Sequence, residues 1–282
     1  MTEVTHAVDE PFIPLSVAAI RRELGAALCG VAVTAYESVH STNDTAMEQF
    51  ETRPPGSFLV VAADVQTAGR GRRGRSWTAK MGENLLMSIA LSYPATVEAP
   101  YGEWPLLAAV AVRRALADET GLSVELKWPN DLLIEGKKVC GILTELCANR
   151  HGRYLVIGVG INVNAGPADL PQEIAARATS LRMHAGRPYD RGRLCARVVE
   201  RVHDLYAETL AGARFALWRD EWVNHCATLG NYVKIIQGDR VIEGMARSLT
   251  DRGTLQIITG TGESREVASG EIVESGTRTM LF

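Results

Sequence analysis

Six apolar runs rich in β-branched residues lie between residues 58 and 162 of this 282-residue chain. Runs of this length and composition predict β-strands. Helical periodicity appears between and after them, most clearly where Pro105 falls in a first turn and Gly121 follows the end. The chain is therefore expected to combine strands and helices in one domain. The expected strands are residues 58–65, 84–91, 123–128, 131–134, 139–146 and 154–162, and the expected helices are residues 15–28, 105–119, 191–210 and 215–225.

From about residue 227 the pattern changes to short strands separated by Gly-Asp, Asp-Arg-Gly and Thr-Gly turns. Strands are expected at residues 232–236, 241–249, 255–258 and 271–274, which together are typical of a small β-barrel. We therefore expect a flexible leader at residues 1–14, a main domain at residues 15–226 and a barrel at residues 227–282.

The overall composition excludes several classes of function. The net charge of −3 argues against bulk attraction to nucleic acid. No segment reaches the roughly 18 uninterrupted apolar residues of a membrane span. The first residues are polar and acidic, without the basic start and apolar stretch of a secretory signal. A cytoplasmic protein with no membrane or nucleic-acid partner is the expectation.

Cysteine and histidine usage predicts neither a disulfide framework nor a metal site. The cysteines are odd in number, scattered and without a Cys-x-x-Cys pair, and the six histidines show no ligand spacing. Reduced thiols are the simpler interpretation. The cysteines are Cys29, Cys140, Cys147, Cys195 and Cys226.

Residues 66–75, Gln-Thr-Ala-Gly-Arg-Gly-Arg-Arg-Gly-Arg, form the most distinctive local feature and are called the arginine loop below. Arginine offers planar, permanently charged donors for phosphate and carboxylate oxygens, and glycine lets the backbone fold tightly around an anion. The Gly-Lys-Ser/Thr ending of a Walker A loop is absent. An exposed basic loop, or an arginine- and glycine-rich nucleic-acid segment, is the alternative.

Three further segments carry polar residues that are compatible with either a binding site or a structural role. Lys127-Trp-Pro-Asn-Asp131 is explained equally well as a rigid hairpin bend or as part of a functional site. It is followed by Lys138, which can neutralise phosphate, and by Gly141, which permits close approach of a ligand. Asn162 ends a strand and suits the edge of an adenine, although asparagine is also common in turns. Ser41-Thr-Asn43 is also compatible with a helix cap.

Together these segments resemble the biotin–protein ligase family. The family's motifs Ser-Thr-Asn, Gln-x-x-Gly-Arg-Gly-Arg-x-Gly-Arg, Lys-Trp-Pro-Asn-Asp, Lys-x-x-Gly-Ile-Leu-x-Glu and Gly-x-Gly-Ile-Asn occur here in that order between about residues 37 and 165. The resemblance implies a catalytic domain similar to class II aminoacyl-tRNA synthetases, with a mixed, mainly antiparallel sheet flanked by helices. It also implies an SH3-like barrel at the C-terminus.

The resemblance implies a role for each matching residue. Biotin contacts are expected from Ser41, Thr42, Asn43, Gln66, Arg70, Arg72, Lys138 and Gly141. Contacts to ATP or the adenylate are expected from Arg70, Arg72, Arg75, Trp77, Asn130, Lys138 and Asn162, where Asn130 and Asn162 are expected to contact the adenylate or to lie beside the metal. Trp77 is the expected stacking partner of adenine, or otherwise a core aromatic.

The implied reaction has two steps. Biotin and ATP, with Mg²⁺, form biotinyl-5′-AMP and pyrophosphate, and biotin then passes to one lysine of a biotin carboxyl carrier domain of an acyl-CoA or pyruvate carboxylase. The expected catalytic residues are Lys138, Arg70, Arg72 and Asp131. Asp131 is nominated to orient or deprotonate the acceptor lysine, or otherwise it only shapes the bend.

Two alternative functions are disfavoured, and the chain differs from some members of the family in one respect. Lipoate or octanoyl transfer uses a related fold, but the intact arginine loop and Trp-Pro-Asn-Asp favour biotin. A non-catalytic nucleic-acid binder is disfavoured because the barrel's charges are mixed and its aromatics few. Ser41 comes after only forty residues, so the chain is expected to lack the N-terminal DNA-binding domain and repressor function of some relatives.

Overall fold

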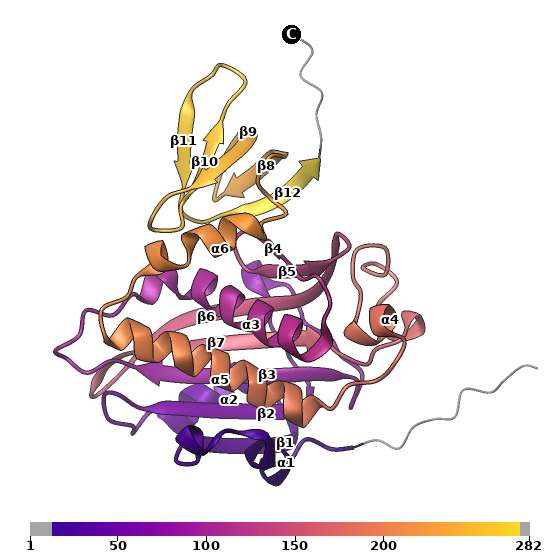
Figure 1. Cartoon of the computed structure of the whole chain (residues 1–282), viewed down its shortest axis with the longest axis vertical. Helices are drawn as coiled ribbons and strands as arrows, with labels where there is room; N and C mark the ends of the chain where they lie inside the picture. The colour runs from indigo at the N-terminus through magenta and orange to yellow at the C-terminus, as the bar shows by residue number, and fades with distance from the viewer. Residues whose placement is uncertain (1–12, 277–282) are drawn as a thin grey trace, which may run out of the picture.

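The computed structural model describes residues 13–276 and arranges them as a layered domain with a smaller β-domain at one end (Figure 1). A seven-stranded sheet forms the centre, in the order β1-β2-β3-β7-β6-β5-β4. β1 and β2 are parallel, and the other neighbouring strands are antiparallel. The predicted mixed, mainly antiparallel sheet is confirmed. Its strands are β1 (Ala32–Val39), β2 (Phe58–Gln66), β3 (Asn84–Ser92), β4 (Glu125–Lys127), β5 (Asp131–Ile134), β6 (Lys137–Asn149) and β7 (Gly152–Asn162).

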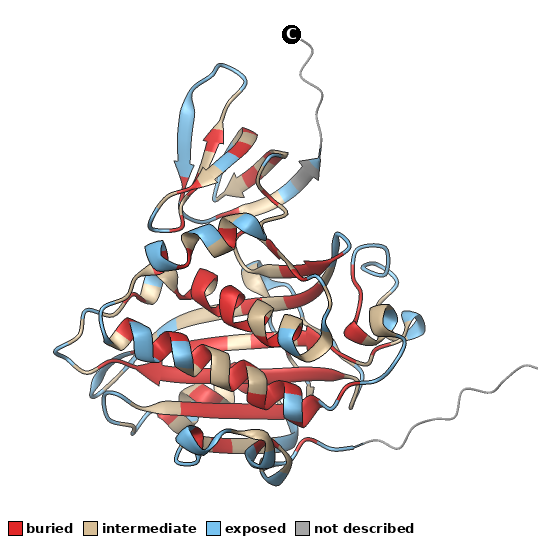
Figure 2. Cartoon of the chain, viewed as in Figure 1, coloured by how far each residue is buried: buried red, intermediate tan, exposed pale blue. Residues whose placement is uncertain are grey.

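Helices cover both faces of this sheet. In β2, Val60 and Ala62 belong to the core under the larger helices, whereas Leu59 and Val61 pack with Phe50 of α2 on the opposite face. This alternation follows from the period of two along a strand, and it makes the central strands buried on both sides (Figure 2). The helices are α1 (Val17–Glu23), α2 (Thr42–Phe50), α3 (Trp104–Thr120), α4 (Leu181–Ala185), α5 (Arg191–Leu210) and α6 (Arg219–Asn224).

A second sheet of five antiparallel strands, in the order β11-β10-β9-β8-β12, forms the C-terminal β-domain. Its buried side chains, including Val233, Ile235 and Leu255, belong to the same continuous apolar core as the large sheet. The two parts therefore pack as one body. The strands are β8 (Tyr232–Gln237), β9 (Arg240–Leu249), β10 (Leu255–Ile258), β11 (Ser264–Val267) and β12 (Glu271–Gly276).

Several elements differ from the sequence-based expectation. The strands β1 and β11 and the helix α2 were not predicted, and the predicted strand at residues 123–128 is reduced to the three residues of β4. The predicted helix at residues 15–28 is interrupted at Leu24 and Gly25, where the backbone is extended, and continues as a 3-10 turn. The Trp-Pro-Asn-Asp segment is the predicted hairpin bend, joining β4 to β5.

The predicted leader falls mostly on residues 1–12, which lie outside the described residues. The next residue, Ile13, is bonded to the layered domain. The Ile13 carbonyl accepts a hydrogen bond from Arg191 at 2.6 Å, and Arg191 forms a buried ion pair with Asp64 at the same distance. The domain limits at residues 15, 226 and 227 stay predictions.

Within residues 13–276, each helix is too short or too polar to cross a membrane. All five cysteines are free thiols. Burial raises the pKa of the Cys195 thiol to about 12, so this thiol stays protonated at neutral pH.

Candidate functional site

Glycines leave an open strip on the α2 face of the large sheet. Tyr154 and Val156 of β7 pack against α2, so Gly158 and Gly160 lie on that same face. Gly160 is also paired with Gly141 of the neighbouring strand β6. Because neither residue of this pair has a side chain, a ligand or another side chain can approach the strand backbones closely.

A cavity of about 560 Å³ lies over this strip, which is within the roughly 300–1,000 Å³ of small-molecule sites. The arginine loop, the Trp-Pro-Asn-Asp bend and the first residues of β12 also contribute to its walls. Every residue that the sequence assigned to the site lines this one cavity, while the individual roles stay predictions. These residues are Ser41, Thr42, Asn43, Gln66, Arg70, Arg72, Arg75, Trp77, Asn130, Asp131, Lys138, Gly141 and Asn162.

The first residues of α2 carry a polar network of neutral side chains, which Asn43 Nδ2 connects to Glu145 Oε2. The Thr42 amide and hydroxyl both donate to Gln66 Oε1, at 2.7 and 2.9 Å. Ser88 Oγ lies 2.7 Å from Thr42 Oγ1 and 2.6 Å from Asn43 Oδ1. Ser41 occupies the N-cap position of α2, but its side chain makes no capping hydrogen bond. The Ser41 hydroxyl is therefore free to bind a ligand rather than to cap the helix.

The arginine loop is an ordered hairpin. The Trp77 amide donates to the Gly69 carbonyl at 2.8 Å, and the Gly71 amide donates to the Arg75 carbonyl at 2.7 Å. A Cβ on Gly69 would lie 2.4 Å from the Trp77 carbonyl oxygen, so only glycine fits there. At the tip, Arg73 has a φ of 57° and a ψ of 40°, a left-handed conformation that non-glycine residues rarely adopt.

Arg70 is neutralised by two carboxylates. It makes a bidentate pair with Asp44 of α2, at 2.6 and 2.7 Å, and a longer contact of 3.4 Å with Glu145 of β6. The hydrogen bonds that Arg70 donates to Asp44 are the main reason why the pKa of Arg70 is raised. Arg70 thus joins the base of the arginine loop to the domain, and its charge is already balanced. Its predicted catalytic role stays a prediction.

Arg72 has the opposite environment. Its Nη1 donates to Asn130 Oδ1 at 2.9 Å, and its Nη2 donates to the Gly270 carbonyl of the β-domain at 3.0 Å. Burial lowers the pKa of Arg72, and the charge of Asp131 only partly offsets this effect. A partly desolvated guanidinium that is bonded to neutral oxygens still has unbalanced charge, so Arg72 is well suited to bind an anion.

Lys138 is held in place from two sides. Its Nζ lies 2.6 Å from Asp131 Oδ1 and 5.5 Å from the centre of the Trp77 ring. Its backbone amide donates to the Arg177 carbonyl at 2.8 Å. These contacts fix the ammonium group at the cavity wall. They also mean that Asp131 could act as a base for another amine only after its pair with Lys138 is broken.

The Trp77 ring lies flat against the glycine strip. A Cβ on Gly160 would lie 2.6 Å from the ring, and a Cβ on Gly141 would lie 2.8 Å from it. The Trp77 indole nitrogen is buried and has no hydrogen-bond partner among the described residues. Trp77 is half-buried and lines the cavity, with its ring and its buried indole nitrogen against the glycine strip.

We expect Gly160→Ala to displace Trp77 and weaken ligand binding at this site. Overpacking of this kind costs about 1–3 kcal/mol, which corresponds to roughly ten- to a hundredfold in affinity. Equilibrium nucleotide binding and tryptophan fluorescence measure the change. Gly30→Ala is the matched control, since a Cβ at Gly30 meets nothing within 4 Å. Equal affinities in both variants would contradict the position assigned to Trp77.

Sequence reasoning missed other residues at the site. Asp44 and Glu145 bind Arg70, and both were visible as the residues that end or follow recognised motifs. The segment at residues 169–178 supplies another wall through side chains that include Leu170 and Ile174, and no local signal marks it. Glu271 also lines the cavity, from more than a hundred residues beyond the last recognised motif.

Comparisons with known proteins give a consistent picture. Residues 35–162 match the model of the biotin/lipoate A/B protein ligase family, and residues 228–273 match the biotin protein ligase C-terminal domain. The Bacillus subtilis bifunctional ligase/repressor BirA is 34% identical over 88% of this chain and 76% of its own. The Mycobacterium tuberculosis biotin–[acetyl-CoA-carboxylase] ligase is 31% identical over 76% of this chain and 78% of its own.

A solved structure is also similar. The biotin protein ligase from Aquifex aeolicus, in complex with biotin and ATP, superimposes with a TM-score of 0.72 and 31% sequence identity. The match covers 85% of this chain and 97% of the other. The likeness therefore extends over both the layered domain and the C-terminal β-domain.

Proposed function

Because the chain belongs to the biotin–protein ligase family, we propose that it joins biotin to AMP with release of pyrophosphate and then transfers the biotin to a carrier lysine. The observation that carries the proposal is the pairing of two unlike walls in one cavity. One wall has fixed cations, Arg72 and Lys138, and the other has the polar network of neutral side chains at the start of α2.

The cationic wall fits the first step. Biotin's carboxylate and the α-phosphate of ATP are both anions, so the site must offset their repulsion while it holds them in line. Lys138 is fixed by Asp131, and Arg72 has unbalanced charge, so both can stabilise the charge that builds on the phosphoryl oxygens without rearrangement.

The uncharged wall fits biotin's ureido group. That group is a neutral donor and acceptor, and it matches hydroxyl and amide side chains better than ionised ones. The free Ser41 hydroxyl and the Thr42–Gln66 pair supply such groups. The Trp77 ring on its glycine strip offers a flat surface for an adenine.

Mg²⁺ would enter this site with the nucleotide. The described residues hold no group of three or more His, Cys, Asp or Glu side chains that could bind a metal ion alone. Mg²⁺ keeps several waters and is usually bound through one or two carboxylates together with substrate phosphates. Asn162 is the residue we propose beside it, since its Nδ2 donates to Thr179 and its Oδ1 has no partner among residues 13–276. The ion would neutralise phosphate charge.

We propose that the acceptor is a lysine of a biotin carboxyl carrier domain. The Mycobacterium tuberculosis relative is a biotin–[acetyl-CoA-carboxylase] ligase, which supports a carboxylase partner here. The acceptor amine must lose its proton, because a free lysine has a pKa near 10.4. Asp131 is the carboxylate at the cavity wall that we propose for this task, once its pair with Lys138 is broken.

The test is incubation with biotin, MgATP and a carrier domain, followed by mass spectrometry. One added biotin on the carrier is expected, and none on a carrier whose acceptor lysine is arginine. Because the matched family model also covers lipoate ligases, lipoate replaces biotin in a parallel reaction. Lipoate-dependent pyrophosphate release that exceeds the biotin-dependent release would reject biotin as the substrate.

A further inference from the structure

The C-terminal β-domain is fixed against the layered domain beside the cavity. Trp128 anchors this junction, since its indole nitrogen donates to the Gly253 carbonyl at 3.1 Å and its amide donates to Thr228 Oγ1 at 3.0 Å. Arg219 forms an ion pair with Asp251 at 2.9 Å across the same junction. With a shared apolar core as well, the β-domain is a rigid neighbour of the cavity rather than a swinging part.

The tip of the arginine loop, residues 72–75, contacts the β-domain through Arg72, Arg73 and Arg75. Arg72 donates to the Gly270 carbonyl at 3.0 Å, and Arg73 donates to the Ile236 carbonyl at 2.5 Å. Arg73 and Arg75 lie 3.5 and 3.0 Å from the two carboxylate oxygens of Glu271. One acidic side chain and two carbonyls, at the adjacent ends of β8 and β12, therefore receive the contacts that the tip makes with the β-domain, while Asn130 of the layered domain accepts a further bond from Arg72.

Little else holds the tip. No residue of its 3-10 turn, Arg72–Gly74, is buried, so apolar packing does not fix its position. Arg73 has the left-handed backbone described above, a strained state that persists only where surrounding contacts impose it. The three arginine charges also repel one another, and Glu271 offsets that repulsion.

We propose that Glu271 is a positioning residue that holds the arginine loop closed over the cavity by pairing with Arg73 and Arg75. Because Glu271 pairs with Arg73 and Arg75, Arg72 has no carboxylate partner among the described residues and can bind an anion. Arg70 ties the base of the loop to α2, and Glu271 ties its tip to the β-domain. The side chains of Arg73 and Arg75 are 36% and 61% exposed, so their pairs with Glu271 are weak and can break and re-form.

If the arginine loop is held closed in this way, the β-domain helps to protect the activated intermediate. This role rests on the proposed function. The activated intermediate must be protected until the carrier arrives, and the loop must then open. Weak, solvent-accessible ion pairs suit that alternation better than apolar packing would. Deleting the β-domain is a poor test, because it would expose the shared core; a single substitution is cleaner.

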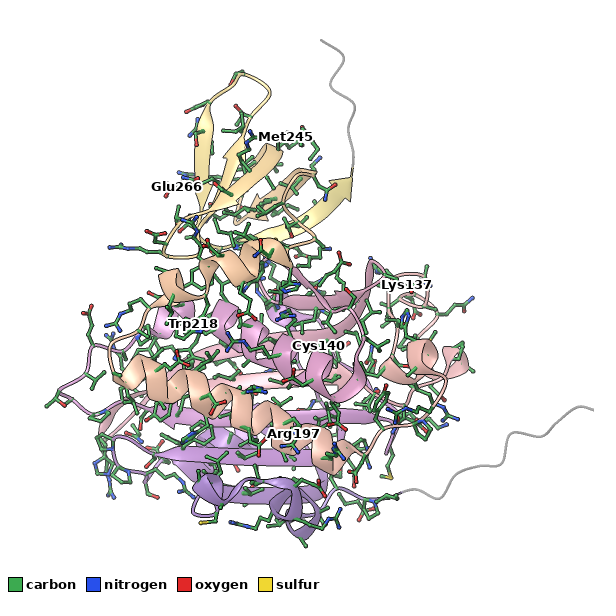
Figure 3. All side chains as sticks on the ribbon, in the orientation of Figure 1. Lys137, Cys140, Arg197, Trp218, Met245 and Glu266 are labelled. Carbon is green, nitrogen blue, oxygen red and sulfur yellow. The ribbon has the colours of Figure 1, made fainter. Side chains whose placement is uncertain are left out.

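The test compares Glu271→Gln with Glu266→Gln, a control on the outer strand β11 (Figure 3). Glu266 is exposed and accepts only a 3.3 Å hydrogen bond from Gln256. Trypsin cleavage after the loop arginines is measured in the full chain without ligand. We expect cleavage about three- to tenfold faster in Glu271→Gln, since two weak ion pairs are lost, and an unchanged rate in the control. Glu271→Asp should restore part of the protection.

A second measurement separates positioning from a general structural effect. In biotin-dependent pyrophosphate release, Glu271→Gln should raise the KM for biotin several-fold and leave kcat within about twofold. Arg73→Gln should act in the same direction, and the double variant should lose less than the sum of the two single effects, because both substitutions remove the same Arg73–Glu271 pair.

Equal cleavage of the wild type and Glu271→Gln, with normal pyrophosphate release, would overturn the inference and leave the proposed function intact. Faster cleavage in a protein whose wild type releases no pyrophosphate would support the inference and reject the function.

Discussion

Lys138→Ala is expected to reduce biotin-dependent pyrophosphate release by roughly a hundred- to a thousandfold, the loss typical of one preorganised charge-stabilising donor. Lys138 is an ammonium fixed by Asp131 at 2.6 Å on the cavity wall, so its removal takes away a cation that needs no rearrangement. The protein should remain folded. The side chains of Lys138 and Asp131 are 33% and 24% exposed, so water can solvate the carboxylate that is left.

The matched control is Lys137→Ala. Lys137 precedes Lys138 on β6. It is exposed and lies on the outside of the layered domain, beside the β5–β6 turn (Figure 3). Both substitutions remove one positive charge from neighbouring positions, but only one removes it from the cavity. A Lys138→Ala variant with pyrophosphate release close to that of Lys137→Ala would show that Lys138 is surface charge.

The elements with a strong local pattern were predicted from the sequence. The helix at residues 191–210 and the strands at residues 131–134 and 255–258 begin and end as expected. The first element that was missed, β1, contains Thr34, Tyr36 and Glu37 and lies at the edge of the sheet, where half-exposed positions dilute the apolar signal. β11 is an exposed edge strand too, with a buried side chain only at Val267.

The members of the site were predictable from motifs, but their individual environments were not. Arg70 and Arg72 are equivalent in the sequence pattern, both following a glycine in one loop. In the structure, Arg70 faces two carboxylates, whereas Arg72 contacts only neutral oxygens. What distinguishes them lies on α2, β6 and the β-domain, so no local pattern separates an anchoring arginine from an anion-binding one.

The same reason explains why Glu271 was not predicted. It lies in a short strand of mixed charge, and its importance comes from two arginines almost two hundred residues earlier. Partners this distant are brought together only by the docking of the β-domain on the Trp-Pro-Asn-Asp bend. The bend is therefore more than a turn, because it carries Asn130 and Asp131 to the cavity and Trp128 to the junction.

Arg72→Gly is expected to weaken biotin binding and to release the activated intermediate prematurely. Arg72 links the loop tip to Asn130 on one side and to the Gly270 carbonyl on the other, so glycine removes both links and adds flexibility. A lost charge-assisted contact is worth roughly 1.5–3 kcal/mol, or about ten- to more than a hundredfold in dissociation. Unlike Glu271→Gln, this change also removes the unbalanced cation itself, so its effect should be the larger.

An escaped acyl adenylate reacts with any accessible amine, so the Arg72→Gly protein should biotinylate lysines of unrelated proteins while the wild type labels only its carrier. Both proteins are incubated with biotin, MgATP and albumin, and the biotin on albumin is measured. Arg150→Gly is the control, because Arg150 is exposed in the β6–β7 turn and donates only to its neighbour His151. If albumin stayed unlabelled by Arg72→Gly and biotin affinity matched that of the control, Arg72 would have no part in retaining the adenylate. In that case the closure of the cavity would depend on the contacts that Arg73 and Arg75 make with Glu271 and with the Ile236 carbonyl.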